Sequence, residues 1–189
     1  MLLSDRTIRD LLTRGVIGLN IIDPERQIQP ASVDLRLDNK FVILEPKIND
    51  WMPTVTVVDT RPGGNQPRMT ERTVKDGDGW LLKPGDFVLA QTVERIRLPS
   101  NIAARVEGRS SFARLAIQVH STAGWIDPGF DGHITLEISN TGPLHVKLFP
   151  GQYITQVSFY QMDHPAERPY HGKYQGQDVP TPSRLHIRG

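Results

Sequence analysis

Residues 127–138, DPGFDGHITLEI, predict a tight turn followed by a strand. After the Pro-Gly pair, three apolar residues alternate with two polar ones, Thr135 and Glu137. Alternation with a period of two predicts a strand that buries its apolar face and presents Thr135 and Glu137 on the other. Similar Pro-Gly pairs stand beside other short apolar runs, at residues 84–85 and 150–151. Short strands separated by regular turns indicate an all-β sandwich, jelly roll or barrel.

Apolar runs on both sides of this stretch predict further strands. They lie at residues 33–37, 41–44, 80–82, 87–93, 103–107, 146–148 and 153–159. Near the N-terminus, Ser4 is a predicted N-cap, followed by apolar residues at helical spacing and then by Gly15. This pattern predicts one short amphipathic helix, and residues 110–116 predict a further helical turn.

Two segments lack the pattern of a helix or a strand. Residues 59–79 are rich in glycine, proline and charge, which predicts a surface loop or a hairpin excursion. Residues 166–189 are polar and predict a tail that is flexible unless a ligand or a neighbouring subunit orders it. A chain of 189 residues is then expected to form one domain with this tail.

Composition narrows the class of protein. The net charge of +1 provides no general field that attracts nucleic acid, so any basic site must be local. The absence of cysteine excludes disulfides and thiolate metal sites and fits a reducing compartment. The N-terminus lacks the apolar core of a signal peptide, and no later run could span a bilayer. We therefore expect a soluble cytoplasmic protein without a nucleic-acid or membrane partner.

Arginines and hydroxyls gather in residues 109–114. Ser110 and Ser111 stand at the start of the predicted helical turn, where hydroxyls and free main-chain N–H groups can donate to phosphate oxygens. Arg109 adds a permanently charged bidentate donor, and Arg114 follows Ser110 by four residues, on the same helical face. The alternative is an ordinary serine cap with surface arginines, which is the commoner arrangement for such a segment alone.

Three carboxylates are candidates for chemistry, and each has an ordinary alternative. Glu137 is a surface residue if its face of the strand meets solvent, and an acid/base group if that face lines a pocket. Asp127 is either a turn residue or a rigidly held ligand for a sugar hydroxyl or a water. Asp34 is either a ligand for a metal-bound water or the partner of Arg36 in a salt bridge on the strand face.

The histidines and the tail carry weaker signals. His120 and His133 have no partner at metal-ligand spacing, so we interpret both as structural. Tyr170, Lys173 and Gln177 combine stacking, charge and amide donors, as a nucleotide site would require. An ordinary polar tail would contain the same residue types.

Five ordered segments together resemble the dCTP deaminase branch of the trimeric dUTPase superfamily. They are residues 29–37, 108–115, 120–137, 150–151 with Gln156, and 173–177 with 181–184. The resemblance implies a mainly β fold, a distorted jelly roll or barrel with a short N-terminal helix and a C-terminal tail that closes over the nucleotide. It also implies a homotrimer with active sites at subunit interfaces, dCTP as substrate and dTTP as a feedback inhibitor.

The resemblance also implies roles for individual residues. The catalytic group would be Glu137, Arg114, Ser110 and Asp127, with Glu137 as the catalytic carboxylate and Asp127 beside the deoxyribose. Asp34 would help to hold Mg²⁺, which otherwise binds with the triphosphate. The nucleotide contacts would come from Arg109, Ser110, Ser111, Phe112, Ala113, Arg114, Asp127, Thr135, Leu136, Glu137, Gln156, Tyr170, Lys173 and Gln177.

Two kinds of enzyme exist in the family that this chain resembles. One releases dUTP, and the other continues to dUMP and pyrophosphate in the same site. The second kind has a glycine and an aromatic residue where the first has a His-Arg pair. Gly124 and Trp125 therefore favour the bifunctional kind.

The lack of cysteine shapes the expected mechanism, because zinc deaminases hold their metal with His/Cys/Cys or three-Cys sets. Glu137 would instead take a proton from the water that attacks C4 of cytosine, with Ser110 and Arg114 orienting that water. A water oriented by Asp127 would then attack the α-phosphorus. Alternatives are a deaminase that releases dUTP, a plain dUTPase, and a catalytically silent trimer that only binds nucleotides.

Overall fold

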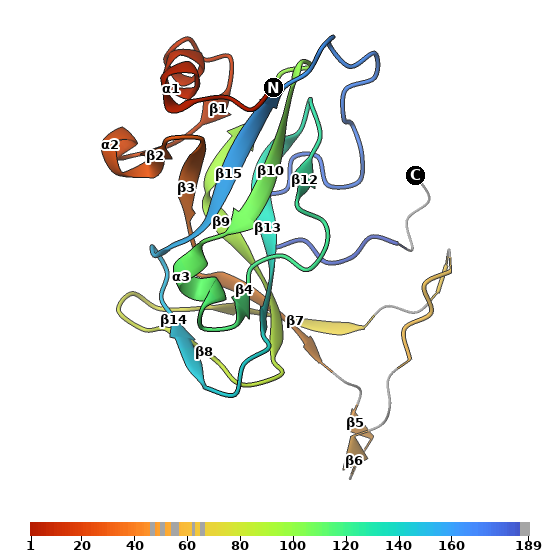
Figure 1. The fold of residues 1–189 in the computed structure, drawn as a ribbon. Coiled ribbons are helices and arrows are strands. Elements are labelled where there is room, and N and C mark those ends of the chain that lie inside the picture. Colours follow the sequence, from red (N-terminus) through yellow and green to blue (C-terminus); the bar gives the residue numbers. More distant parts are fainter. Residues whose placement is uncertain (46–47, 50–51, 54–56, 62, 65–66, 186–189) are drawn as a thin grey trace.

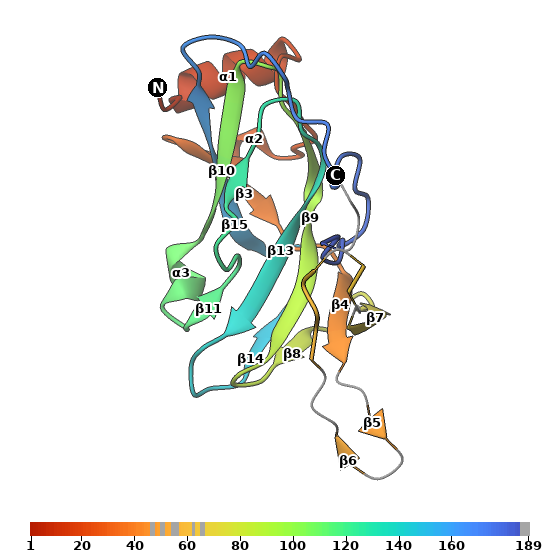
Figure 2. The same ribbon diagram turned by 90° about the vertical axis from the view of Figure 1, so that its right-hand side faces the viewer.

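Two facing β-sheets form the body of the protein in the computed structural model (Figures 1 and 2). The structure describes residues 1–45, 48–49, 52–53, 57–61, 63–64 and 67–185. The prediction of a mainly β fold is confirmed. Strand pairing among these residues closes no barrel, and the two sheets form a distorted sandwich. In the same part of the chain, no helix is long and apolar enough to cross a membrane.

The six-stranded sheet is antiparallel and has the order β11-β13-β9-β4-β7, with β1 paired to β9. Long β9 and β13 lie side by side at its centre (Figure 2). Its strands are β1 (Gly18–Leu19), β4 (Lys40–Glu45), β7 (Arg68–Thr73), β9 (Phe87–Arg97), β11 (Ile117–Gln118) and β13 (Asp131–Asn140).

The five-stranded sheet has the order β12-β10-β15-β3-β2 and is also antiparallel. Its strands are β2 (Ile28–Gln29), β3 (Ser32–Arg36), β10 (Ile102–Gly108), β12 (Trp125–Ile126) and β15 (Tyr153–Gln161). Two small two-stranded sheets complete the described strands, β5 (Ile48–Asn49) with β6 (Met52–Pro53) and β8 (Trp80–Leu82) with β14 (Val146–Leu148).

Three helices are described, α1 (Asp5–Thr13), α2 (Pro24–Gln27) and α3 (Ser110–Ala113). The predicted N-terminal helix is α1, with Ser4 as its N-cap, although the Ser4 hydroxyl makes no capping hydrogen bond. Ile8 is fully buried and anchors the helix to the core. Gly15, with φ +68°, ends the helical path in a conformation that glycine adopts without a steric cost.

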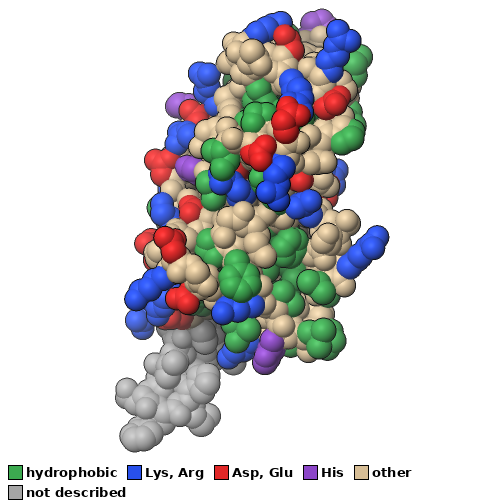
Figure 3. All heavy atoms as spheres, turned by 90° about the vertical axis from the view of Figure 1, so that its left-hand side faces the viewer, with side chains coloured by type: hydrophobic (Ala, Val, Ile, Leu, Met, Phe, Trp, Pro, Cys, Tyr) green, Lys and Arg blue, Asp and Glu red, His purple; other side chains and the backbone are tan. Residues whose placement is uncertain are grey.

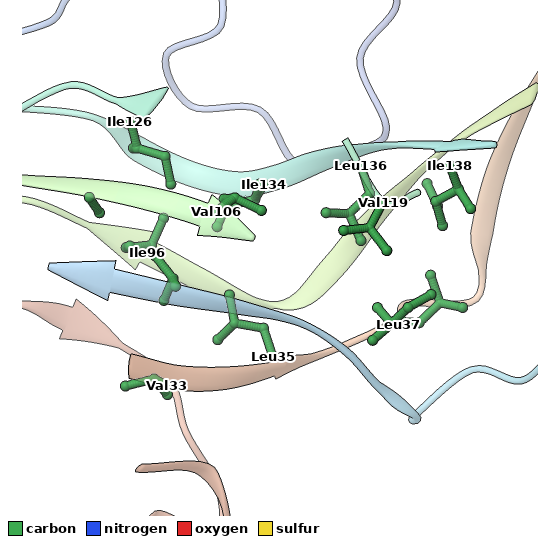
Figure 4. Close-up of a cluster of buried hydrophobic side chains, with 14 of the residues drawn as sticks. Val33, Leu35, Leu37, Ile96, Val106, Val119, Ile126, Ile134, Leu136 and Ile138 are labelled. Atoms are coloured by element: carbon green, nitrogen blue, oxygen red, sulfur yellow. The ribbon is translucent and has the colours of Figure 1, made fainter. Parts of the chain in front are cut away.

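Alternating apolar side chains fill the space between the sheets (Figure 4). Val33 and Leu35 project from β3, and Leu136 and Ile138 project from β13 on the opposite side. All four are fully buried. Burial of one such side chain stabilises a fold by about 1.5–3 kcal/mol, so this layer holds both sheets in a fixed position.

A buried ion pair replaces the salt bridge that was an alternative for Asp34. Arg36 Nε donates to Glu94 at 2.7 Å, and the Gln27 amide donates to the same carboxylate at 3.0 Å. Glu94 is completely buried and hydrogen-bonded, as a buried charge must be. The alternative in which Asp34 pairs with Arg36 is therefore wrong, because Arg36 pairs with Glu94 at 2.7 Å and Asp34 pairs with Arg109 at 3.3 Å.

The predicted strands are present, and the long ones extend further than their apolar runs. Residues 80–82 and 146–148 are β8 and β14 as predicted. β9 continues to Arg97, because main-chain pairing with β13 carries the ladder through polar residues. Within residues 59–79, β7 pairs with β4, so this excursion contains a strand as well as a loop. Residues 166–185 form no helix or strand, but hydrogen bonds tie them to the body.

Candidate functional site

The two faces of β13 meet different surroundings. Leu136 is fully buried in the core, whereas Thr135 and Glu137 point away from it and are half-buried. Leu89 on β9 stands directly beside Glu137 in the sheet. Glu137 therefore lies on the outer face of the strand, as the period-two pattern predicted. The residues that cover this outer face determine its environment.

A cavity of about 630 Å³ lies over this outer face. Its floor is the six-stranded sheet, and its walls are the loop before β13, the tail and the excursion after β4. The lining includes Leu44, Val58, Asp59, Thr60, Met69, Phe87, Leu89, His120, Trp125, Asp127, Thr135, Glu137, Tyr170, Tyr174, Gln177 and Thr181. Glu137 is therefore a pocket residue rather than an open-surface carboxylate.

Main-chain contacts hold Glu137 in the cavity wall. Its Oε2 accepts a hydrogen bond from the Ser121 main-chain N–H at 3.0 Å, and its own N–H donates to Val119 O at 3.0 Å. These bonds join the loop before β12 to β13 on both sides of His120. A carboxylate fixed in this way keeps one oxygen free for a ligand.

His120 also lies in the cavity wall. Its interpretation as a structural residue, made from the sequence alone, did not predict this position. Its Nε2 is 3.5 Å from Glu107 Oε2 on β10. Its Nδ1 is buried and has no hydrogen-bond partner among the described residues. The ring of His133, by contrast, contacts Thr92 O at 3.0 Å through Nδ1, as suits a structural residue.

The loop that leads into β13 presents Asp127 and Trp125 to the cavity. Gly129 has φ +91°, so the Asp-Pro-Gly turn requires glycine and fixes Asp127 at its corner. Trp125 is tilted against Tyr160 at a ring distance of 5.7 Å. A Cβ at Gly124 would lie 2.8 Å from Val106 O, so a larger residue there would displace the loop.

The tail forms another wall of the cavity. The ring of Tyr170 packs against Phe130 at 5.9 Å, and its N–H donates to Pro128 O at 2.7 Å. Gln177 donates through its side chain to His133 O and accepts from the His133 N–H through its main chain. Lys173 is not in the lining, because its ammonium donates to Arg184 O within the tail.

The arginine-hydroxyl segment lies elsewhere. α3 starts after Arg109 and ends before Arg114, whose N–H donates to Ser110 O at 3.0 Å. Ser110, Ser111 and Arg114 are exposed, and none of residues 109–114 lines the cavity. Figures 1 and 2 show α3 and the tail on opposite sides of β13. The predicted helical turn is confirmed, but this chain alone does not bring it to Glu137.

Arg109 belongs to a second cluster, on the outer face of the five-stranded sheet. Its guanidinium is 3.3 Å from Asp34, and it donates to Tyr153 O at 3.1 Å. Gln156 stands beside Asp34 in the sheet and accepts a hydrogen bond from Ser32. Burial raises the pKa of Asp34, and the charge of Arg109 opposes that shift.

The donor set around Asp34 does not fit a metal ion. No group of three metal-ligating side chains occurs in the described part of the chain. Asp34 is nearly buried and its partner is a cation, which repels Mg²⁺. Asp34 alone therefore does not form a metal site among the described residues, and its water-mediated contact with Mg²⁺ held by the triphosphate stays a prediction.

Exposed apolar side chains occur just after α3 and on both sides of β14. Leu115, Leu144 and Phe149 are 50%, 67% and 37% exposed. Figure 3 looks onto the side of the molecule that carries α3 and shows hydrophobic side chains gathered in its lower half. Apolar patches of this kind mark surfaces that contact other molecules.

Comparison with known proteins places this chain in a family. Residues 2–162 match the sequence profile of dCTP deaminase-like proteins. The chain belongs to the dCTP deaminase-like family. A Thermobifida fusca protein named dCTP deaminase, dUMP-forming, is 46% identical over 193 residues, which cover 99% of this chain and 94% of that protein. A Bifidobacterium adolescentis protein of the same name is 48% identical over 193 residues, with 99% and 95% coverage.

A solved structure gives the family fold. The 2′-deoxycytidine 5′-triphosphate deaminase of Agrobacterium tumefaciens superposes with a TM-score of 0.62 at 24% identity. The match covers 83% of this chain and 46% of that chain, so this protein spans less than half of it. At this identity the likeness establishes a shared fold.

In this dCTP deaminase-like chain, the predicted site residues fall into separate places. Asp127, Thr135, Glu137, Tyr170, Gln177 and Trp125 line the cavity, whereas residues 109–114, Gln156, Lys173, Gly124 and Asp34 do not. The Leu136 side chain is in the core, so only its main chain can reach a ligand from β13.

Sequence reasoning missed the far walls of the cavity. Phe87 and Leu89 carried a usable signal, because they alternate in a predicted strand, but their register against Glu137 could not be read. Thr60 and Met69 come from the excursion at residues 59–79, to which the sequence assigned no role, and Val58 directly precedes it. No local pattern distinguishes them from ordinary surface residues.

Proposed function

We propose that this protein hydrolyses dCTP to dUMP, pyrophosphate and ammonia without zinc. Two waters are consumed, one at C4 of cytosine and one at the α-phosphorus. The observation that carries the proposal is Glu137, a carboxylate held in a cavity wall in a chain of the dCTP deaminase-like family. The names of the relatives, which are dUMP-forming dCTP deaminases, support the complete reaction. In this proposal, residues 1–189 form one domain whose tail closes the site.

The charge of the cavity argues that one copy of the chain does not complete the site. Glu137 and Asp127 line it, and Asp59 at its edge is paired with Arg61 at 2.6 Å, which lowers the pKa of Asp59. No lysine or arginine is among the described lining residues. A triphosphate needs cations, and the exposed Arg114 lies on another side of the molecule.

A homotrimer resolves this difficulty in the proposal. α3 of one copy supplies the guanidiniums of Arg109 and Arg114 and the hydroxyls of Ser110 and Ser111 to the cavity of its neighbour. The exposed apolar residues around α3, such as Leu115 and Leu144, suit a subunit contact. The remaining nucleotide contacts come from Thr135, Asp127 and the tail of the copy that owns the cavity.

In the first step, Glu137 takes a proton from water as the oxygen attacks C4, and it delivers that proton to N3 of the ring. A second proton transfer through Glu137 allows the amino group to leave as ammonia, which gives dUTP. The Ser121 N–H fixes the carboxylate during both transfers. Ser110 and Arg114 of the neighbouring copy hold the water and the developing charge.

In the second step, a water positioned by Asp127 attacks the α-phosphorus, and pyrophosphate leaves. Mg²⁺ carried by the triphosphate would neutralise part of its charge. The close approach of Gly124 to Val106 O supports this bifunctional assignment, since the histidine of the dUTP-releasing kind would not fit the present loop. A deaminase that stops at dUTP is the second candidate. The same site would bind dTTP as a feedback inhibitor.

Product analysis tests the reaction. Purified protein is incubated with dCTP and Mg²⁺, and in parallel with dUTP, and nucleotides and ammonia are quantified by chromatography and an ammonia assay. We expect dUMP, pyrophosphate and ammonia in equal amounts from dCTP. Accumulation of dUTP would establish the second candidate, and binding without turnover would establish a silent nucleotide-binding protein.

Mixed oligomers test the shared site. Glu137→Gln and Arg114→Ala are each expected to be inactive alone. If the acid and the guanidinium come from different copies, exchanging subunits between the two variants restores a fraction of wild-type activity. If both come from one copy, the mixture stays as inactive as its components.

A further inference from the structure

A charge cluster outside the cavity joins the tail to the six-stranded sheet. Arg95 on β9 contacts Asp131, at the start of β13, with Nε at 2.8 Å from Oδ1. Its Nη1 contacts Asp178 in the tail at 2.5 Å. None of the three residues lines the cavity, and the proposed chemistry uses none of them.

The tail residues beside Asp178 are cavity residues. Tyr174, Gln177 and Thr181 line the cavity, and Asp178 lies between the last two in the chain. Neutral hydrogen bonds follow the same path, from Gly176 N to Asp131 O at 2.8 Å and from Thr181 N to Thr135 Oγ1 at 3.2 Å. Arg95 thus adds charge to a contact whose other bonds are neutral.

Electrostatics gives Arg95 a double effect. Docking of the tail brings the carboxylates of Asp131 and Asp178 to the same guanidinium. Without that guanidinium, two like charges would face each other, which disfavours docking. All three side chains are partly exposed, so the attraction is modest and salt screens it.

We propose that Arg95 is a positioning residue for nucleotide binding. It holds the tail on β13 through Asp131 and Asp178, and this contact keeps Tyr174 and Gln177 in the wall of the nucleotide cavity. The inference rests on the proposed function. It concerns the affinity for dCTP, because Arg95 touches neither the cavity nor Glu137.

Limited proteolysis tests the tail contact independently of catalysis. Trypsin cleavage after Lys173, followed by mass spectrometry in protein without added nucleotide, reports opening of the tail. Arg95→Gln should be cleaved about fivefold faster than wild type, the factor expected for loss of weak exposed pairs. Arg97→Gln is the matched control, because Arg97 lies on the same strand, its side-chain hydrogen bond goes to Gly15 O, and no hydrogen bond or ion pair joins its side chain to the described tail. Equal cleavage of both variants would overturn the proposal.

Kinetics tests the consequence for the nucleotide. Arg95→Gln and Asp178→Asn should each raise the KM for dCTP about fivefold with kcat within about twofold of wild type. The double variant should add little to the larger single effect, because both substitutions break one contact. Arg95→Lys should recover part of the affinity, and the urea midpoint of Arg95→Gln should equal that of Arg97→Gln.

The outcomes separate the two hypotheses. A KM and cleavage rate for Arg95→Gln equal to those of Arg97→Gln would refute the role of Arg95 while dCTP turnover stands. A lowered urea midpoint with a matching loss of kcat would also refute it, since that pattern belongs to a destabilised fold. Fast cleavage of Arg95→Gln in a protein that never turns over dCTP would refute the proposed function and support the tail contact.

Discussion

Strand β13 and the C-terminal tail both line the cavity, but they are held in very different ways. β13 lies inside the six-stranded sheet, with β11 and β9 paired to its two edges and Leu136 and Ile138 buried beneath it. The tail has no helix or strand in residues 166–185 and is fixed by scattered hydrogen bonds and by the exposed ion pair of Asp178 with Arg95. Glu137 therefore belongs to the rigid part of the molecule, and closure of the site belongs to the weakly held tail.

Energies show why the two parts should behave differently. Each buried apolar side chain on β13 contributes about 1.5–3 kcal/mol, whereas an exposed ion pair contributes about 0–1 kcal/mol. A segment held by few buried contacts opens locally long before the fold unfolds. Opening of the tail is thus expected while β13 stays in place, which lets a nucleotide enter without disturbing Glu137.

The largest expected effect is on the rigid part, at Glu137. Glu137→Gln keeps the shape of the side chain but removes the proton acceptor, so kcat for ammonia release should fall by about 10²–10⁴-fold. Binding of dCTP, measured by calorimetry, should change little. Glu71→Gln is the control, because Glu71 is exposed on β7 of the same sheet and outside the cavity lining. Deamination at the wild-type rate by Glu137→Gln would remove the acid/base assignment.

The opposite face of β13 tests rigidity itself. Leu136→Ala leaves a cavity in the core and should lower the free energy of unfolding by about 2–5 kcal/mol, measured by urea denaturation. Ile22→Ala is the control, since Ile22 is 69% exposed and should change stability by less than about 0.5 kcal/mol. Similar effects of the two substitutions would contradict the packed core beneath Glu137.

The free energy of unfolding should depend on pH through the buried carboxyl group of Asp34, in contrast to the salt-sensitive ion pair of the tail. Burial raises the pKa of Asp34, so the folded state keeps this proton to a higher pH than the unfolded chain. The contribution of Asp34 to stability is therefore complete below its ordinary pKa and is lost as pH rises through the raised value. Asp34→Asn should gain stability relative to wild type across this window, as measured by urea unfolding at a series of pH values.

The positive charge of Arg109 acts on the pKa of Asp34 in the direction opposite to burial. If its charge outweighed burial, the stability of Asp34→Asn relative to wild type would fall as pH rises, and the raised pKa would be refuted.

The smallest expected effect concerns one hydrogen bond of the tail. Thr135→Val removes the acceptor of the Thr181 N–H while keeping the volume of the side chain. Loss of one such bond is worth about 0.5–1.5 kcal/mol, so tryptic cleavage after Lys173 should accelerate roughly two- to tenfold. Thr73→Val on exposed β7 should leave the cleavage rate unchanged. Unchanged cleavage of Thr135→Val would show that this bond does not hold the tail.

Much of the fold could be predicted from local pattern. The alternation around Glu137 predicted β13 and the direction of its side chains, and Ser4 and Gly15 predicted the two ends of α1. Turn chemistry was informative for the same reason, since Gly129 must adopt positive φ in its turn. Short elements such as β1 and β11 escaped prediction, because two residues of pairing leave no periodicity to detect.

The candidate site was predictable only in part. The sequence could not decide whether Glu137 met solvent or a pocket, because the covering residues lie far from it along the chain. Thr60 and Met69 from the excursion, and Tyr174 from the tail, reach the same cavity through tertiary contacts. The partner of Asp34 was likewise undecidable, because Arg109 and Arg36 are both close to it in space or sequence, and packing of Glu94 decided between them.

The sequence by itself determined the secondary structure around Glu137, the lack of thiolate chemistry and the family to which the chain belongs, because these depend on residue identity and short-range spacing. Tertiary structure alone decided that Glu137 faces a cavity, that α3 lies away from it, and that Arg95 ties the tail to β13. The physical reason is that burial and charge pairing depend on which distant strands and loops come together. The register of the sheets decides which of these segments become neighbours.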